Sequence, residues 1–311
     1  MLLICKQMMT VGTLLLSAGL LNSALADTIT VCLDGTCDFT DPAAAADIAV
    51  TGDTIEIAAG TYLLDAPVIV YGQNIHVRGE VDSDGRPAVI LDGQGATTVI
   101  NTLVLTDQST FENLIVMNGF AEYGGGMFLF NSDPVFRNCI IRDNHAEFEG
   151  GGLFMNHGSS PTFIGCEIIN NTASHPVWDS GHGAAVRMLT GKLTLVDTLV
   201  AGNTAEIGGG AIAFNSDTEM VLERSRICGN ESPDGPQVWG SGVVTNLGGC
   251  IEDDCDVCVT TVPTDLNFDG SVNVVDLLLL LEMWGGSGSG DIDDNGIVDV
   301  VDLLLLIAAW N

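Results

Sequence analysis

Basic side chains are scarce in this sequence. Its 311 residues include 9 Lys+Arg against 41 Asp+Glu, which gives a formal net charge of −32. Nucleic-acid binding requires clustered Lys and Arg to contact phosphates, so the composition excludes it. The same charge disfavours anionic membranes and strongly acidic polysaccharides, because like charges repel. Hydrophobic residues nevertheless make up 46 % of the chain, too many for a disordered acidic protein, so we expect a buried core.

The sequence also lacks an apolar run long enough to span a membrane. The leucine runs near residues 277 and 303 are shorter than the ~20 residues that a span requires. The first 26 residues predict a secretory signal peptide, with Lys6 as its positive charge, residues 11–21 as its apolar stretch and residues 24–26 as its cleavage site. An uncleaved membrane anchor is the alternative. We therefore expect an extracellular or cell-surface protein that is not integral to the membrane.

Cysteine usage fits an oxidising compartment. Loss of Cys5 with the signal peptide leaves eight of the nine cysteines, and an even number in an exported protein indicates disulfides. Three of the cysteines have a spacing that superficially suggests zinc, but export favours disulfides. Cys32 and Cys37 are close enough to pair, whereas the second group leaves its pairing open; it comprises Cys228, Cys250, Cys255 and Cys258.

The middle of the chain repeats with a period of about 26 to 32 residues. Each unit has an Asn, a short variable stretch, a glycine-rich cluster and a short apolar run. Runs of β-branched and aromatic residues broken by Gly, Asn and Asp predict several short strands per unit. The aligned residues are Asn118, Asn144, Asn171, Asn203 and Asn230, and the glycine clusters begin at Gly124, Gly150, Gly181, Gly208 and Gly240.

Stacking of such units makes side chains at equivalent positions lie above one another. Each strand pairs with its copy in the next unit, about 4.8 Å away. We therefore expect Phe136 to stack on Phe163 and Cys139 on Cys166. Asn at the turns tolerates left-handed backbone and can donate hydrogen bonds along the stack.

These repeats resemble the right-handed parallel β-helix, the pectin-lyase-like fold. The segments that carry the likeness to secreted bacterial repeats are residues 144–146 (Asn-His-Ala) and 150–154 (Gly-Gly-Gly-Leu-Phe). Residues 51–62 are similar to the first coil of that fold, and Asp41-Pro42 resembles the start of its capping helix. The resemblance implies a mainly-β solenoid over residues 27–250, but it does not specify an activity.

The composition changes through a linker at residues 251–264, and residues 265–311 contain a duplicated 12-residue loop that enters an apolar run. Oxygen side chains at loop positions 1, 3, 5 and 12 with Gly at position 6 suit Ca²⁺, which takes about six to eight oxygen ligands. Two solvated acidic turns are the alternative. The predicted ligands of two Ca²⁺ ions are Asp265, Asn267, Asp269, Ser271, Asn273 and Asp276, and Asp291, Asp293, Asn295, Ile297, Asp299 and Asp302, with Ser271 and Ile297 using their carbonyls.

This tail resembles the dockerin type I module, a small α-helical calcium-binding unit. The resemblance implies that two ions fold the module, which then attaches a secreted protein to a cohesin-bearing scaffold. Valine replaces the hydroxylated residues usual at the partner-reading positions, so another cell-surface partner is the alternative. These positions are Val274, Val275, Val300 and Val301.

Candidate catalytic residues are few. Asp179 and His182 lie in a Gly-His-Gly context similar to the polygalacturonase-type glycoside hydrolases, but that family's paired aspartates are missing, and the repeat aligns His182 with middle glycines. Glu122 and Glu147 occupy equivalent turn positions about 5 Å apart, a spacing that suits a retaining glycosidase or simply a solvated acidic edge. A polysaccharide lyase is disfavoured, because its base could only be Arg137, Arg142 or Arg187.

Aromatic residues in the same turns can stack on sugar rings or cover the end of the solenoid interior; they are Tyr123, Phe148, Trp178 and Trp239. The sequence therefore predicts a secreted, carbohydrate-interacting β-helix protein that is docked through a calcium-dependent module. Polysaccharide is its expected partner, and glycoside hydrolysis is the candidate activity. The alternative is a non-catalytic extracellular adhesin or surface structural protein.

Overall fold

The computed structural model describes residues 26–175, 181–255, 257, 264, 266, 272–286, 290–293 and 296–310. Most of the predicted signal peptide lies outside these residues, as do several predicted functional residues. Those residues are Trp178, Asp179, Asp265, Asn267, Asp269, Ser271 and Asn295.

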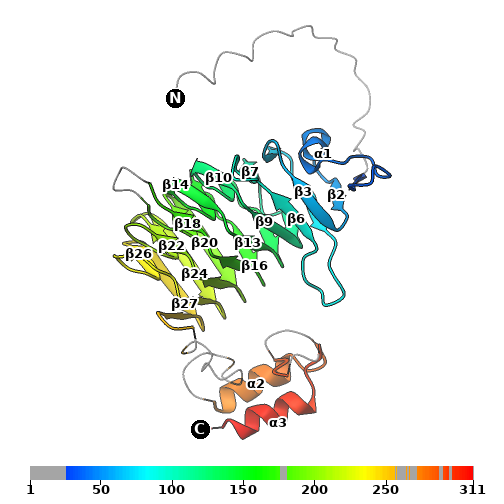
Figure 1. The fold of residues 1–311 in the computed structure, drawn as a ribbon. Coiled ribbons are helices and arrows are strands. Elements are labelled where there is room, and N and C mark those ends of the chain that lie inside the picture. The colour runs from blue at the N-terminus through cyan, green and yellow to red at the C-terminus, as the bar shows by residue number, and fades with distance from the viewer. Residues whose placement is uncertain are drawn as a thin grey trace, which may run out of the picture.

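The described chain winds into a right-handed parallel β-solenoid of about 8 turns (Figure 1). Each full turn contributes one strand to each of three long parallel sheets, and four consecutive turns add a strand to a fourth sheet. The mainly-β fold predicted from the repeat is confirmed.

The strands of each sheet follow the chain from one turn to the next. The nine-stranded sheet contains β1 (Thr28–Val31), β2 (Thr54–Ile57), β5 (His76–Gly79), β8 (Thr110–Glu112), β12 (Val135–Arg137), β16 (Thr162–Ile164), β20 (Gly191–Val196), β24 (Thr218–Glu223) and β27 (Val243–Leu247). The eight-stranded sheet contains β3 (Gly60–Leu63), β6 (Val89–Asp92), β9 (Leu114–Met117), β13 (Ile140–Arg142), β17 (Glu167–Ile169), β21 (Leu199–Ala201), β25 (Arg226–Cys228) and β28 (Cys250–Glu252).

The third long sheet, with seven strands, and the short fourth sheet carry the candidate site described below. The seven-stranded sheet contains β4 (Val68–Tyr71), β7 (Ile100–Leu103), β11 (Met127–Phe130), β15 (Leu153–Asn156), β19 (Val186–Met188), β23 (Ile212–Phe214) and β26 (Val238–Gly240). The four-stranded sheet contains β10 (Phe120–Tyr123), β14 (His145–Glu149), β18 (Thr172–Ala173) and β22 (Thr204–Ala205).

A short helix, α1 (Pro42–Ile48), packs against the first strands as predicted. Asp41 is its N-cap and accepts a hydrogen bond from the Ala43 amide, while Pro42 occupies the first turn, where its missing N–H is not needed. Its buried alanines contribute to the same hydrophobic core as the strands.

Inward side chains form the predicted ladders. Phe136 pairs with Phe163 between β12 and β16, and Leu195 and Leu222 continue the ladder on β20 and β24. The buried thiols of Cys139 and Cys166 lie on a second ladder, in which the Cys139 amide donates to the Cys166 sulfur at 3.4 Å. Both thiols are free.

Disulfide bonds lie near each of the two ends of the solenoid. Cys32 is bonded to Cys37, and Cys228 to Cys255. Cys250 is disulfide-bonded as well. Within the part of the chain that the structure describes, the cysteines outside the ladder are thus disulfide-bonded, which is consistent with an extracellular protein.

Four buried asparagines form a hydrogen-bonded column along the stack. The Asn144 side-chain amide donates to the Asn171 oxygen at 2.9 Å, Asn171 donates to Asn203 at 3.0 Å, and Asn203 to Asn230 at 2.8 Å. The alignment on Asn118 was wrong by one residue, because Gly119 occupies the equivalent position and its amide donates to the Asn144 oxygen. The left-handed residues precede the column; they include Asn118, Asp143 and Asn170.

Two further helices, α2 (Val274–Glu282) and α3 (Val300–Ala308), pack against each other around a small core. Each begins with a capping box, in which Asn273 or Asp299 is the N-cap and Asp276 or Asp302 reaches back to its main-chain amide. Among the described helices, none has the length and apolar character needed to cross a membrane.

Candidate functional site

An ion pair between the buried Arg187 of β19 and the half-buried Glu149 of β14 lies on the outer face of the seven-stranded sheet. The Arg187 Nε atom is 3.1 Å from Glu149 Oε1, and the arginine residue is only 7 % exposed. The two terminal nitrogens of Arg187 donate to the Met188 carbonyl and to Asn215 Oδ1, each at 3.0 Å. The guanidinium is therefore fixed in place and its charge is balanced.

His182 lies beside this ion pair. Its Nδ1 is 3.8 Å from Glu149 Oε1, and its ring centroid is 4.8 Å from that of Trp239. Burial lowers the pKa of His182, although the Glu149 carboxylate opposes that shift. The imidazole is therefore held in its neutral form near pH 7, in which one ring nitrogen can accept a hydrogen bond.

The alignment of His182 with the middle glycines was wrong. His182 forms bridges with Glu149 and Gly208, each of which directly precedes a glycine with a positive φ. The glycine equivalent to Gly150 (φ 70°) is Gly183 (φ 62°). His182 thus takes the place of an acidic side chain or a glycine, so the repeat does not by itself explain why a histidine is there.

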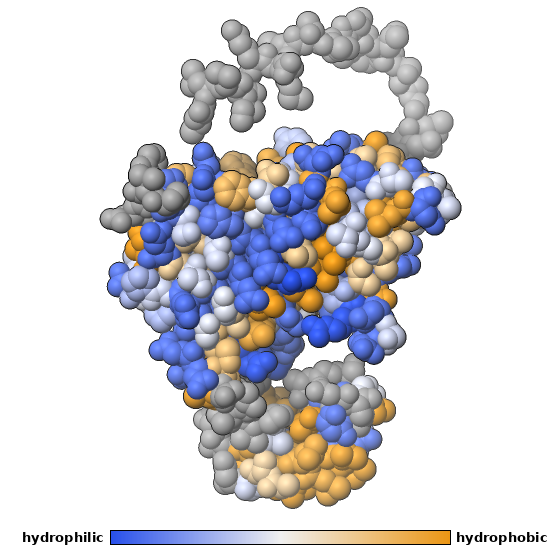
Figure 2. All heavy atoms as spheres, in the orientation of Figure 1, coloured by the Kyte–Doolittle hydropathy of each residue, from blue (hydrophilic) through white to orange (hydrophobic). Residues whose placement is uncertain are grey.

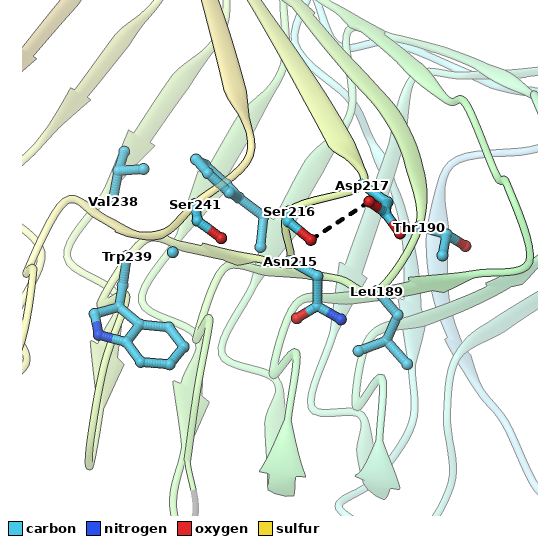
Figure 3. Close-up of a pocket in the computed structure, with 10 residues that line it drawn as sticks. Leu189, Thr190, Asn215, Ser216, Asp217, Val238, Trp239 and Ser241 are labelled. Carbon is cyan, nitrogen blue, oxygen red and sulfur yellow. Dashed lines mark hydrogen bonds between the residues drawn. The ribbon is translucent and has the colours of Figure 1, made fainter.

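A cavity of about 830 Å³ opens beside Trp239, along the loops that follow β19, β23 and β26 (Figure 3). Trp239 was predicted to lie in a turn, but it is a strand residue of β26 and pairs with Ala213. The turn that was assumed to reach Gly240 ends earlier, at the positive-φ Gly235. The described residues that line the cavity are Leu189, Thr190, Phe214, Asn215, Ser216, Asp217, Val238, Trp239, Gly240 and Ser241.

The other predicted sugar-binding aromatic residues stack on one another. The rings of Tyr123 and Phe148 have centroids 5.5 Å apart, and Phe148 stacks on His175 at 5.1 Å with planes 7° apart. Burial, followed by the charges of Glu149 and Glu122, raises the pKa of Tyr123. Because neighbouring rings occupy each other's faces, this row offers mainly ring edges to a ligand. Trp178 lies outside the described residues.

The predicted carboxylate pair lies on neighbouring strands of the four-stranded sheet. Ala121 pairs with Ala146, directly before Glu122 and Glu147, but the register then shifts so that Tyr123 pairs with Glu149. The two glutamates are thus close in the sheet at the point where its register is irregular. Asp179, the proposed partner of His182, lies outside the described residues.

Sequence reasoning missed Glu149 and Asn215, and it considered Arg187 only as the base of a lyase. A signal for Arg187 was present, since it stands at a position occupied by Phe154 and Ala213 on the adjacent strands. A charged residue in an apolar ladder requires a buried partner. That partner could not be identified without the register of the strands.

Three carboxylates gather in the second C-terminal loop. Side-chain oxygens of Asp291, Asp293 and Asp302 lie within 4.8 Å of one another. The Asp302 carboxylate is buried and accepts main-chain N–H bonds from Ile292 (2.6 Å), Asp293 (3.2 Å) and Asp299 (2.7 Å). Burial alone would raise the pKa of Asp302, but these amides outweigh it and lower the pKa, so the carboxylate stays ionised.

This donor set fits a hard cation. Clustered ionised oxygens are the ligands that Ca²⁺ prefers, and the Gly296 amide that donates to Asp291 Oδ2 (2.7 Å) wraps the loop around them. Of the other predicted ligands, Asn273 and Asp299 cap the helices, Asp276 is buried like Asp302, and Ile297 is exposed. The remaining ligands lie outside the described residues.

The four predicted partner-binding valines lie on the first turns of α2 and α3. Their residues are 42–56 % exposed, and Figure 2 shows hydrophobic side chains gathered over these helices. The valines concerned are Val274, Val275, Val300 and Val301.

Comparison with known proteins identifies the fold. Residues 68–255, more than half of the chain, match the family model for the right handed beta helix region. Among solved structures, the chain is similar to the pectin methylesterase from Aspergillus niger, with 13 % identity and a TM-score of 0.39 over 75 % of this chain and 87 % of that one. No curated protein matches the sequence.

Proposed function

Because the chain belongs to the right-handed β-helix family, we propose that it is an extracellular, carbohydrate-binding solenoid that a calcium-binding C-terminal module attaches to a partner. The family specifies the scaffold and not the ligand, so the proposal depends on the chemistry of its surfaces.

The observation that carries the carbohydrate-binding role is the cavity at Trp239. An indole that is 37 % exposed borders an open cavity of about 830 Å³, whose lining includes Asn215, Ser216 and Asp217. An aromatic surface with a few directional hydrogen-bonding groups is the usual composition of a small-molecule or sugar site.

The attachment role is supported by the three clustered carboxylates of Asp291, Asp293 and Asp302. Bound Ca²⁺ would neutralise their mutual repulsion and hold the loop against α3. The exposed valines at the start of both helices supply the apolar contact for a cohesin-like or other cell-surface protein. We further propose that residues 1–26 are removed on export and that the two units are linked by the part of residues 251–264 that follows β28 and the Cys228–Cys255 disulfide.

Hydrolysis of glycosidic bonds is a second candidate function. It is favoured by the pairing of Ala121 with Ala146, which brings Glu122 and Glu147 onto adjacent strands. A retaining glycosidase would use one carboxylate as nucleophile and the other as acid and base. Without such chemistry, the protein acts as an adhesin.

The experiment is a binding panel with the chain that starts at Asp27, run in calcium and in chelator. Neutral and uronic polysaccharides are tested for binding and for release of reducing ends. Binding in calcium supports the carbohydrate role, and failure to bind any polysaccharide contradicts it. Released reducing ends that disappear in Glu122→Gln or Glu147→Gln identify an enzyme, whereas binding without release identifies an adhesin.

A further inference from the structure

We propose that the cavity beside Trp239 binds a neutral polysaccharide, with the indole as the stacking surface and Asn215 and Asp217 as the groups that hydrogen-bond its hydroxyls. This inference deepens the proposed carbohydrate-binding function and rests on it. It assigns both the location of the site and the chemical class of the ligand.

Trp239 differs from Tyr123 and Phe148 because one of its faces is left available. A Cβ atom at Gly208 would lie 3.0 Å from the indole Cγ, so one face of the ring packs directly on that glycine, beside His182. Trp239 belongs to β26, which is the terminal strand of its sheet among the strands that the structure describes. Within the described chain, no further rung of this sheet covers the opposite face, whereas the rings of Tyr123 and Phe148 cover each other.

A row of three residues on one face of the sheet ends in this indole. Across three adjacent strands, Arg187, Ala213 and Trp239 are in register on the same outer face. Ala213 itself is fully buried between these two large side chains, and the hollow beside the indole is the cavity that Phe214, Asn215 and Trp239 line. Successive residues of a strand point to opposite faces, so Asn215, two residues after Ala213, returns to this side at the edge of the hollow. In Figure 3, the side chains of Trp239, Asn215 and Leu189 follow one another along this edge.

The ion pair behind the hollow orients a donor toward the ligand. Arg187 Nη2 donates to Asn215 Oδ1 at 3.0 Å, which fixes the amide so that its NH₂ group remains to donate to a sugar oxygen. Asn215 itself is exposed, so this donor is accessible. The ion pair thus acts on the ligand through Asn215, as a positioning element.

The charges around the hollow favour an uncharged ligand. The positive charge of Arg187 is balanced by Glu149 at 3.1 Å and is buried, so it cannot pair with a uronate carboxylate. Among the described residues that line the cavity, Asp217 alone is charged, and Ser216 Oγ donates to its Oδ1 at 3.4 Å. A carboxylate accepts hydrogen bonds from sugar hydroxyls but repels a uronate.

The test measures affinity of the chain from Asp27 in calcium for soluble β-glucan, xylan and galactomannan, with polygalacturonate and chitosan as charged probes. We expect binding to at least one neutral polysaccharide that persists at ~0.5 M NaCl, because hydroxyl contacts and stacking are screened little by salt. Trp239→Ala should lower this affinity about tenfold or more, as truncation of a central aromatic anchor does, and Trp239→Tyr should restore part of it. Asp217→Ala should also weaken binding.

The matched control is Tyr71→Ala. Tyr71 is an exposed aromatic residue on β4, at the other end of the same sheet, and its removal should leave affinity unchanged. Unchanged affinity in Trp239→Ala, or in Asp217→Ala, overturns the inference and leaves carbohydrate binding elsewhere on the solenoid intact. Binding confined to polygalacturonate or chitosan overturns it too. Failure to bind any polysaccharide refutes the proposed carbohydrate function itself.

Discussion

The ring of Phe163 stacks on that of Phe136 in the preceding turn, with centroids 4.6 Å apart and planes 9° from parallel. This separation matches the spacing of neighbouring strands, so the two side chains occupy the same inward position of successive turns. Phe111 extends the stack by one more turn, at 5.1 Å from Phe136. The interior is therefore a column in which each ring depends on the one beside it.

Truncation within this column should destabilise the solenoid strongly. Phe163→Ala removes a fully buried ring and leaves a cavity between Phe136 and Leu195, at a cost of about 3–5 kcal/mol. The shift in the guanidinium unfolding midpoint measures it. Thr162→Ala, on the same strand but only partly buried, should shift the midpoint far less. Equal unfolding midpoints for the two variants would contradict a stabilising role of the ring column.

The asparagine column makes a similar prediction for polar groups. Asn203→Ala removes the acceptor of the Asn171 amides and the donor to the Ile168 carbonyl, which leaves buried groups without partners. The expected loss is about 3 kcal/mol, since each buried unsatisfied group costs about 1–3 kcal/mol. The measurement is the thermal unfolding midpoint of Asn203→Ala. The control is Thr204→Ala, at the exposed neighbouring position, which reports any general loss of strand propensity. A Thr204→Ala variant as unstable as Asn203→Ala would contradict it.

Two histidines should make stability depend on pH. Burial lowers the pKa of both His145 and His182, so the unfolded chain takes up protons more readily than the folded chain. Their contribution is complete above the unfolded pKa of about 6.5 and is lost as the pH falls below it. Between about pH 7 and pH 5, the double variant His145→Gln/His182→Gln should lose less stability than the original protein. Parallel pH profiles for the two proteins would refute this contribution.

Periodicity was sufficient to predict the ladders but not the site. Phe136 and Phe163, like Cys139 and Cys166, are 27 residues apart in units without insertions, so counting alone gives their register. The turn that precedes His182 is longer, and His182 is flanked by two glycines, Gly181 and Gly183, that look equivalent in the sequence. Which of them takes the place of Gly150 is decided by main-chain hydrogen bonding between turns, and composition does not encode that choice.

Neither the pairing of Glu149 with Arg187 nor the exposure of Trp239 could be predicted from the sequence, because both depend on the register between turns. Glu149 and Arg187 are 38 residues apart, and they meet only because β14 and β19 lie in different sheets that adjoin at this corner. The position of Trp239 depends on Gly235, rather than Gly240, ending the last turn. The prediction placed the end of that turn a few residues too late, and it therefore assigned Trp239 to a loop instead of a strand.

The loop carboxylates were predictable because their spacing lies within one short segment. Asp291, Asp293 and Asp302 were expected as ligands, and the loop brings their oxygens within 4.8 Å. Removal of calcium should therefore decrease the helix signal of α2 and α3 in far-UV circular dichroism, while the strand signal of the solenoid stays constant. An identical spectrum in chelator and in calcium would contradict a calcium-dependent fold.

Calcium titration by calorimetry tests the attachment role most directly. We predict that the chelator-treated chain from Asp27 binds two Ca²⁺ ions. The Asp302→Ala variant should bind one, because Asp302 is the buried member of the carboxylate cluster in the second C-terminal loop. Glu282→Gln, an exposed residue at the end of α2, should leave the stoichiometry at two. Absence of binding heat, or an Asp302→Ala variant that still takes up two ions, would contradict the account.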